Sequence, residues 1–216
     1  METMVSEARG NRAAEILGGC TVKVTRSTTI ETEQFELGDV ISFTLTTGEE
    51  VKAKAVLETP NGMLFITVDC LRNEQKMFEN LGGAEKVDYE HSDLRKKLNG
   101  EIFESFPEEI KGRMVGMRVG QTNCFDMLRI PTEREIFGDN PCGKDEPVSV
   151  RRFYGMENRR ERIAFQGSET GIWEWYWLQN KVEDSASLFA YVDGENNAEC
   201  DDASMSIGVR PVFLLA

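Results

Sequence analysis

Residues 40–68 contain three short apolar segments joined by two turn sequences, and this pattern constrains the fold more than any other feature. Thr47-Gly48-Glu49-Glu50 separates the first two segments, and Asn61-Gly62, a dipeptide typical of two-residue β-hairpins, separates the last two. The segments are rich in β-branched residues. Because connections this short join antiparallel neighbours, we expect a three-stranded meander whose strands cover 40–46, 51–57 and 63–68.

Two short helices are expected after this meander. The first, over 94–106, repeats an apolar residue every four positions, with Ser92 or Asp93 as its N-cap and Pro107 at its end. The second lies within 132–138, where a threonine and a glutamate three residues apart match a capping box and a glycine ends the helix. A short strand is expected to enter this second helix.

The C-terminal half alternates long polar segments with short β patterns. Residues 138–150 and 157–170 are predicted to be loop or irregular, whereas 172–178, 187–192 and the apolar stretch 206–215 are predicted to be strands. We therefore expect an α+β domain over 35–216, with small antiparallel sheets, two short helices and long ordered loops. Residues 1–34 are expected to form an N-terminal extension with a helix and a short strand, suited to attachment or oligomerisation.

The charge balance argues against two classes of partner. The chain has 38 acidic and 25 basic residues and a net charge of −13, so neither nucleic acid nor an anionic membrane surface is expected to bind it. No apolar run approaches the ~18 residues of a membrane-spanning helix, and no secretory signal is recognised. The five cysteines stand at no metal-ligand spacing, which favours reduced thiols and synthesis in the cytoplasm.

Signals for catalysis are weak. His91 is the single histidine and adjoins Glu90 and Ser92 in sequence, an arrangement that cannot form a hydrolytic triad. The phosphate-binding, dinucleotide-binding, zinc-protease and nucleophile-elbow motifs do not occur. We therefore expect no enzymatic activity and no cofactor. Acidic residues within 138–146 and 193–202 could supply some oxygen ligands to calcium, but neither segment has EF-hand spacing, and solvated acidic loops are favoured.

All three tryptophans lie within the heptapeptide Ile172-Trp173-Glu174-Trp175-Tyr176-Trp177-Leu178. In a strand the three indoles would share one face and Tyr176 would lie on the other. Three aromatic side chains could form a core or a ligand platform. We favour the core and expect Tyr176 to lie nearest a binding surface, while the platform stays open as an alternative.

The polar stretch 191–202, before the last strand, is the favoured binding region, because recognition residues commonly lie on loops held by a rigid scaffold. An ordinary acidic hairpin loop is the competing interpretation. The candidate ligand-binding residues are Tyr176, Gln179, Asn180, Tyr191, Asp193, Glu195, Asn196, Asn197, Glu199 and Asp201.

Three blocks of sequence carry a family resemblance: residues 89–99, residues 128–138, and the pair formed by 175–178 and Gly208-Val209-Arg210-Pro211. Together they resemble a family of domains from gut bacteria and their phages. That family is similar to the C-type-lectin fold used by formylglycine-generating enzymes and by the variable proteins of diversity-generating retroelements. The resemblance covers about 35–216 and implies that fold, with a C-terminal recognition segment that such retroelements can randomise.

The sequence departs from two patterns within that fold. Cys200 stands apart from Cys142, so the cysteine pair of the oxidases is missing within one loop. The calcium-binding triplets of animal lectins are also missing. The resemblance thus implies a non-enzymatic protein that recognises a protein or glycan on a cell surface, displayed on a virion or cell and strengthened by homo-oligomerisation. The alternative is a structural virion or assembly protein that has no specific ligand.

Overall fold

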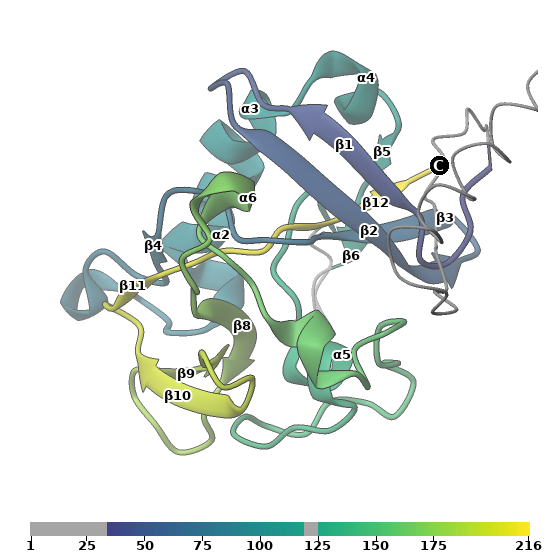
Figure 1. Cartoon of the computed structure of the whole chain (residues 1–216). Coiled ribbons are helices and arrows are strands. Elements are labelled where there is room, and N and C mark those ends of the chain that lie inside the picture. Colours follow the sequence, from purple (N-terminus) through teal and green to yellow (C-terminus); the bar gives the residue numbers. More distant parts are fainter. Residues whose placement is uncertain (1–33, 119–124) are drawn as a thin grey trace, which may run out of the picture. The chain divides into compact units, whose positions relative to one another are not determined.

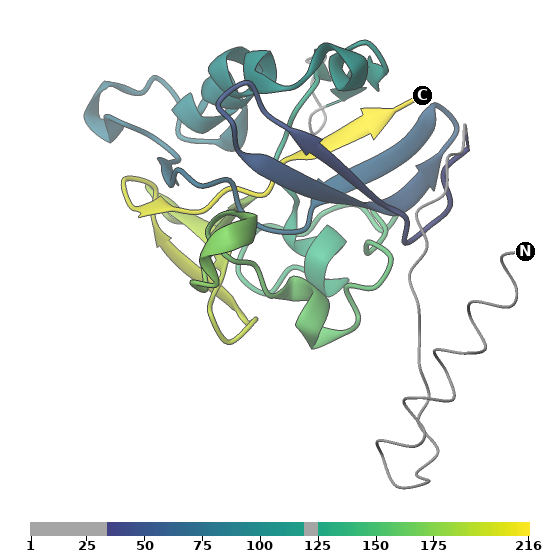
Figure 2. The same ribbon diagram turned by 45° about the horizontal axis from the view of Figure 1, so that its top comes forward.

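The computed structural model describes residues 34–118 and 125–216. The helix and strand predicted in the N-terminal extension lie outside the described residues, so the division of the chain at residue 34 stays a prediction. Within 35–216 the chain forms an α+β fold with several antiparallel sheets (Figures 1 and 2).

The main sheet has five antiparallel strands in the order β1-β2-β3-β12-β5. Its strands are β1 Val40–Thr44, β2 Glu50–Thr59, β3 Gly62–Thr67, β5 Met114–Val115 and β12 Val212–Leu215. The first three confirm the predicted meander. At the β2–β3 turn Gly62 has φ of +136°, and a Cβ there would overlap the backbone oxygen of Leu215, which accounts for glycine in the predicted hairpin.

Both faces of the main sheet are buried. Phe65 and Phe213 belong to one core, whereas their neighbours Ile66 and Val212 belong to the other. The two phenylalanines stack with ring centroids 5.7 Å apart. Antiparallel sheets commonly leave one face in solvent. This sheet has apolar residues on both faces, so each face needs other segments to cover it.

A continuous helical segment covers the first core (Figure 2). It comprises α2 Asp93–Lys97, the π-helical η3 Leu98–Ile102 and α3 Phe103–Ser105. Ser92 caps it by accepting a hydrogen bond from the N–H of Arg95, and Phe106 ends it before Pro107, as predicted. Leu94 and Leu98 are fully buried on the predicted apolar face.

The second core is covered by α5 Glu133–Phe137, by the segment that follows it as far as Ala164, and by residues 176–178 and 190–192. The predicted capping box is present, and Gly138 ends α5 with φ of +89°. Arg129 and Glu135 form a buried bidentate ion pair with N–O distances of 2.7 and 2.6 Å. Arg129 makes a single bridge to Val212 instead of the predicted strand. The short turn α4 Glu108–Lys111 forms where the residues after Pro107 allow a helix to start, whereas α6 Gly167–Thr170 lies in a segment that was predicted to be irregular.

A second sheet has the strand order β10-β9-β8, with β8 Tyr176–Lys181, β9 Leu188–Val192 and β10 Ala198–Asp202. Two predictions are corrected here. The strand expected to begin at Ile172 begins only at Tyr176. The polar stretch 191–202, which was expected to be a binding loop, contains the strand β10. Short elements complete the described fold: β4 Gln75–Lys76, β6 Met117–Arg118, β7 Phe125–Asp126, β11 Ser206–Ile207, η1 Leu81–Gly83, η2 Tyr89–His91 and η4 Arg159–Arg162.

The last apolar stretch is divided between β11 and β12, as the proline within it suggests. Between them, Gly208 pairs with Tyr176 of β8 and links the two sheets. Its N–H donates to Trp175 O at 2.8 Å, and its own oxygen accepts from Trp177 N at 3.1 Å. Among the described residues no helix is long and apolar enough to cross a bilayer.

Gly208→Ala should destabilise the fold. The added Cβ would overlap Glu174 Cγ and lie 2.6 Å from both Cys70 Sγ and Trp175 O. Crowding of this kind typically costs about 1–3 kcal/mol of unfolding free energy. Gly82→Ala is the matched control, because its nearest neighbour would lie at 3.5 Å. Equal stability of the two variants in urea denaturation would contradict the close packing at Gly208.

Candidate functional site

Two of the three tryptophans lie on the surface. Trp173 is 66% exposed, Trp175 42% and the neighbouring Ile172 59%. We call these three side chains the aromatic surface. Trp177 is fully buried, so the preference for an all-tryptophan core was correct for Trp177 alone. These exposures favour the alternative of an aromatic platform for the other two indoles.

Trp175 is supported from below by a chain of aromatic contacts. Its ring stacks on that of Tyr191 with centroids 5.4 Å apart and an interplanar angle of 25°. Tyr191 in turn meets Trp177 edge to face at 6.4 Å, and the indole N–H of Trp177 donates to Gln75 O at 2.8 Å. The exposed indole is therefore coupled to the core through ring contacts that fix its plane.

A short ordered loop, residues 193–197, packs beside the aromatic surface. Asp193 Oδ1 accepts hydrogen bonds from the N–H groups of Glu195 at 2.9 Å and Asn197 at 2.7 Å. Asn196 is buried and takes φ of +67°, a conformation that asparagine tolerates better than most residues. Arg159 Nε donates to Glu195 O at 2.8 Å. The loop is thus held by its own side chains and by η4.

The loop leaves little space beside both indoles. A Cβ on Gly194 would lie 3.3 Å from Trp175 Nε1 and 3.8 Å from Trp173 Cε3, so a side chain at this position would contact both rings. In β10, Glu199 pairs with Tyr191. Burial, followed by the carboxylates of Asp201, Glu199 and Asp193, raises the pKa of Tyr191. The predicted residues that the structure brings together are Tyr191, Asp193, Glu195, Asn196, Asn197, Glu199 and Asp201.

Tyr176 does not lie at a binding surface, and that prediction is wrong. Its ring is fully buried beneath the guanidinium of Arg210, 4.8 Å from ring centroid to Cζ, and its hydroxyl donates to Arg162 O at 3.1 Å. Tyr176 packs in the second core, whereas Trp177 packs in the first. A strand that lies between two cores buries both of its faces. The alternation of side chains along 172–178 therefore could not tell which residue faces solvent.

Gln179 and Asn180 lie away from the aromatic surface and hold α5. Gln179 Nε2 donates to Ile130 O, and Asn180 Oδ1 accepts from the N–H of Glu133 at 2.7 Å. Both residues line a depression of about 280 Å³ next to Glu146. Glu146 accepts hydrogen bonds from Asn140 and Asn180, so this carboxylate of the acidic segment 138–146 takes part in an amide network.

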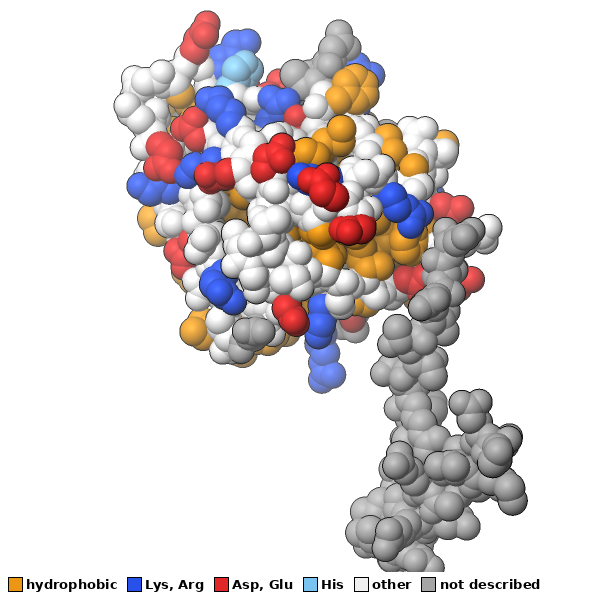
Figure 3. Space-filling view, turned by 90° about the horizontal axis from the view of Figure 1, so that it is seen from above, with side chains coloured by type: hydrophobic (Ala, Val, Ile, Leu, Met, Phe, Trp, Pro, Cys, Tyr) orange, Lys and Arg blue, Asp and Glu red, His pale blue; other side chains and the backbone are white. Residues whose placement is uncertain are grey.

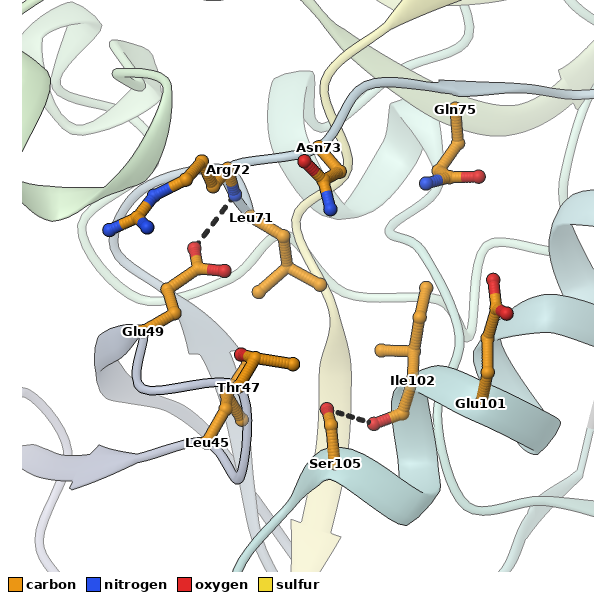
Figure 4. Close-up of a pocket in the computed structure, with 10 residues that line it drawn as sticks. All are labelled: Leu45, Thr47, Glu49, Leu71, Arg72, Asn73, Gln75, Glu101, Ile102 and Ser105. Atoms are coloured by element: carbon orange, nitrogen blue, oxygen red, sulfur yellow. Dashed lines mark hydrogen bonds between the residues drawn. The ribbon is translucent and has the colours of Figure 1, made fainter.

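A larger cavity of about 510 Å³ was not predicted (Figure 4). Figure 4 shows Asn73 and Gln75 extending toward Glu101 and Ile102 of the helical segment, with Glu49 on another side. Burial raises the pKa of Glu49, whose carboxylate accepts a hydrogen bond from the N–H of Arg72 at 2.7 Å. Its lining is Leu45, Thr47, Glu49, Leu71, Arg72, Asn73, Gln75, Glu101, Ile102 and Ser105. We call it the polar cleft.

The polar cleft adjoins an irregular turn of helix. Gly100, within the π-helical η3, has φ of −114° and ψ of −107°, which are not helical values. Single π turns inside α-helices occur often at functional sites. Sequence periodicity could not find this feature, because Leu94, Leu98 and Ile102 fit an uninterrupted helix equally well.

His91 lies on the surface, with Nδ1 2.5 Å from Asp88 Oδ1. Together with Glu90 these residues form the one group of possible metal ligands found in 34–118 and 125–216, with ligand atoms within 4.8 Å of one another. On the face drawn in Figure 3, acidic and basic side chains are interspersed around gathered apolar ones. That face presents no extended tract of a single charge.

Residues 61–216 match the model of a domain of unknown function, DUF6273. The chain belongs to this family. Comparison with curated proteins and with solved structures gave no match. The DUF6273 match begins at the β2–β3 turn and includes β3 to β12, and hence the whole aromatic surface. β1 and all of β2 precede it, although β2 pairs with β3 in the same sheet.

The different exposures of the tryptophans predict their fluorescence. In the double variant Trp173→Phe/Trp175→Phe the buried Trp177 is the sole emitter. Its emission should shift to shorter wavelength than that of the unchanged protein, and acrylamide should quench it several-fold less. Phe125→Ala, an exposed aromatic on β7, is the control and should leave the spectrum unchanged. Efficient quenching of Trp177 would contradict its burial.

Proposed function

We propose that this chain is a non-enzymatic ligand-recognition domain that binds a neutral glycan through the aromatic surface and the 193–197 loop. The observation that carries the proposal is the exposure of Trp173 and Trp175, at 66% and 42%, beside a hydrogen-bonded loop. Apolar side chains exposed together on a domain commonly mark an interaction site.

The chemistry next to the indoles favours a sugar. An indole face provides a flat apolar surface for the C–H side of a pyranose ring. Glu195 and Asn197 are exposed in the adjoining loop, and carboxylate and amide groups can bond to hydroxyl groups. Three carboxylates already surround Tyr191 and the chain carries a net charge of −13, so an anionic glycan would be repelled.

The order of this surface supports recognition as well. Asp193 fixes the loop backbone, and stacking on Tyr191 fixes Trp175, so little conformational freedom is left to lose on binding. A binding surface ordered in advance gains affinity because the entropy cost of association falls. A protein ligand would use the same aromatic surface, and the binding experiment below distinguishes the two.

We propose further that the fold is of C-type-lectin type, as the resemblance of the three sequence blocks implies. The small antiparallel sheets support this assignment, and so does the long segment between β7 and β8, which contains only short helices. The recognition residues then lie just before the last strands, where related variable proteins place theirs. Display on a virion or cell, oligomerisation, and attachment through residues 1–34 belong to the same proposal.

Binding to immobilised neutral oligosaccharides tests the proposed function. At least one neutral glycan should bind, and Trp173→Ala or Trp175→Ala should each weaken it at least about tenfold, since each removes stacking and apolar contact. Phe125→Ala should bind normally. No binding by the folded protein, or full binding by both tryptophan variants, would refute the glycan proposal. Binding only to a protein would support the protein-ligand rival, and no binding to either class would favour the assembly role.

Sequencing this gene from many cells of one population tests the retroelement part of the proposal. Changes should be confined to adenine-containing codons at exposed positions such as Glu195, Asn197 and Glu199. Gly208 and Arg210 should stay fixed, because both are buried at the junction of the two sheets. A uniform segment would exclude diversification while leaving a fixed recognition role intact.

A further inference from the structure

Arg210, in the Gly208-Val209-Arg210-Pro211 block, lines a cavity of about 360 Å³ that shares no residue with the aromatic surface or the polar cleft. The cavity lies beside β2 and β3 and the segment around η4. Its lining residues are Lys54, Ile66, Val68, Asp69, Met156, Arg160, Glu161, Ile163, Phe165 and Arg210. The volume falls in the range of about 300–1,000 Å³ typical of small-molecule sites.

The guanidinium of Arg210 is incompletely bonded. The residue is 2% exposed, and Nε donates to Thr67 O at 3.0 Å. Its Cζ lies over the ring of Tyr176, 4.8 Å from the ring centroid. Nη1 is buried and has no hydrogen-bond partner among the described residues. A buried cationic donor left in this state is costly, and an anionic oxygen would satisfy it.

The other charges of the cavity leave room for one negative group. Lys54 Nζ pairs with Glu161 at 2.6 Å, so these two charges balance. Asp69 opposes Arg210, but its Oδ1 accepts the N–H of Phe165 at 3.2 Å. Burial raises the pKa of Asp69. Arg160, which is exposed, adds a further positive charge at the lining.

The remaining walls are apolar. Ile66, Val68, Met156, Ile163 and Phe165 supply hydrocarbon surface to the same cavity that Arg210 lines. A site that combines one charge-assisted donor with apolar walls selects a ligand with an anionic head and an apolar body. We propose that this cavity binds a small organic carboxylate, whose head group bonds to Nη1 of Arg210 and whose hydrocarbon part packs against these walls.

Isothermal titration calorimetry with hexanoate on the full chain at pH 7 tests the site. Hexanoate should bind at one site with a Kd at or below about 1 mM. Hexan-1-ol, which has the same chain without the charge, should bind at least about tenfold more weakly. Absence of binding up to about 10 mM hexanoate, or equal affinity for the alcohol, would overturn the proposal.

Variants assign the binding to this cavity. Asp69→Asn keeps an oxygen for the N–H of Phe165 but removes a negative charge, so hexanoate should bind at least about threefold more tightly. Ile163→Trp should fill the cavity and abolish binding. Arg152→Gln, which alters an exposed arginine outside the lining, should bind normally. Arg210→Gln should lose binding if it folds. Unchanged affinity in both Asp69→Asn and Ile163→Trp would refute this location whether or not Arg210→Gln folds.

Discussion

The burial of β12 on both faces is the constraint on which the rest of the described structure depends. Phe213 and Leu215 enter one core, and Val212 and Leu214 enter the other. Each such side chain removed from water contributes about 1.5–3 kcal/mol, and the strand obtains this from all four residues only if both faces are covered. A helical segment covers one face, and the other is covered by β8 and β9 of the second sheet, by α5 and by irregular chain. The irregular part of this cover is ordered by specific bonds, such as those from the Cys142 and Gly143 N–H groups to the carboxylate of Glu133.

The residues that precede β12 join the two sheets. Gly208 allows the chain to pass against β8, with Cys70 Sγ and Trp175 O too close for any side chain. Two residues later, Arg210 lies over Tyr176 and bonds to Thr67 O, so one short segment contacts β8, β3 and the second core. The aromatic surface follows directly from this junction, because Trp175 is the residue that Gly208 meets. A change that loosens the junction would therefore move the proposed binding surface as well.

Local signals in the sequence predicted much of the fold. The hairpin at Asn61-Gly62 and the capping box at Thr132 depend on residues close in sequence, and both form as expected. The strand over 172–178 failed for a non-local reason. Ile172 to Glu174 lie against 164–166, as in the Trp173–Phe165 bridge, and only from Tyr176 does the chain pair with β9. The hydrophobic pattern of the sequence gives no sign of that change of partner. It gives no sign either that η4 packs against the 193–197 loop.

The two groups of tryptophans have different relations to stability. Trp177 lies in the core with its N–H bonded, so the fold accounts for it. Trp173 leaves two thirds of its surface in water, and most of the stabilisation that burial of an indole could provide is not obtained. At that exposure, beside a loop whose backbone is already hydrogen-bonded, a smaller residue would stabilise the fold almost as well as Trp173 does. A bound ligand would cover this exposed indole surface. Because folding accounts for Trp177 but not for Trp173, we look for the function at Trp173 and its neighbours.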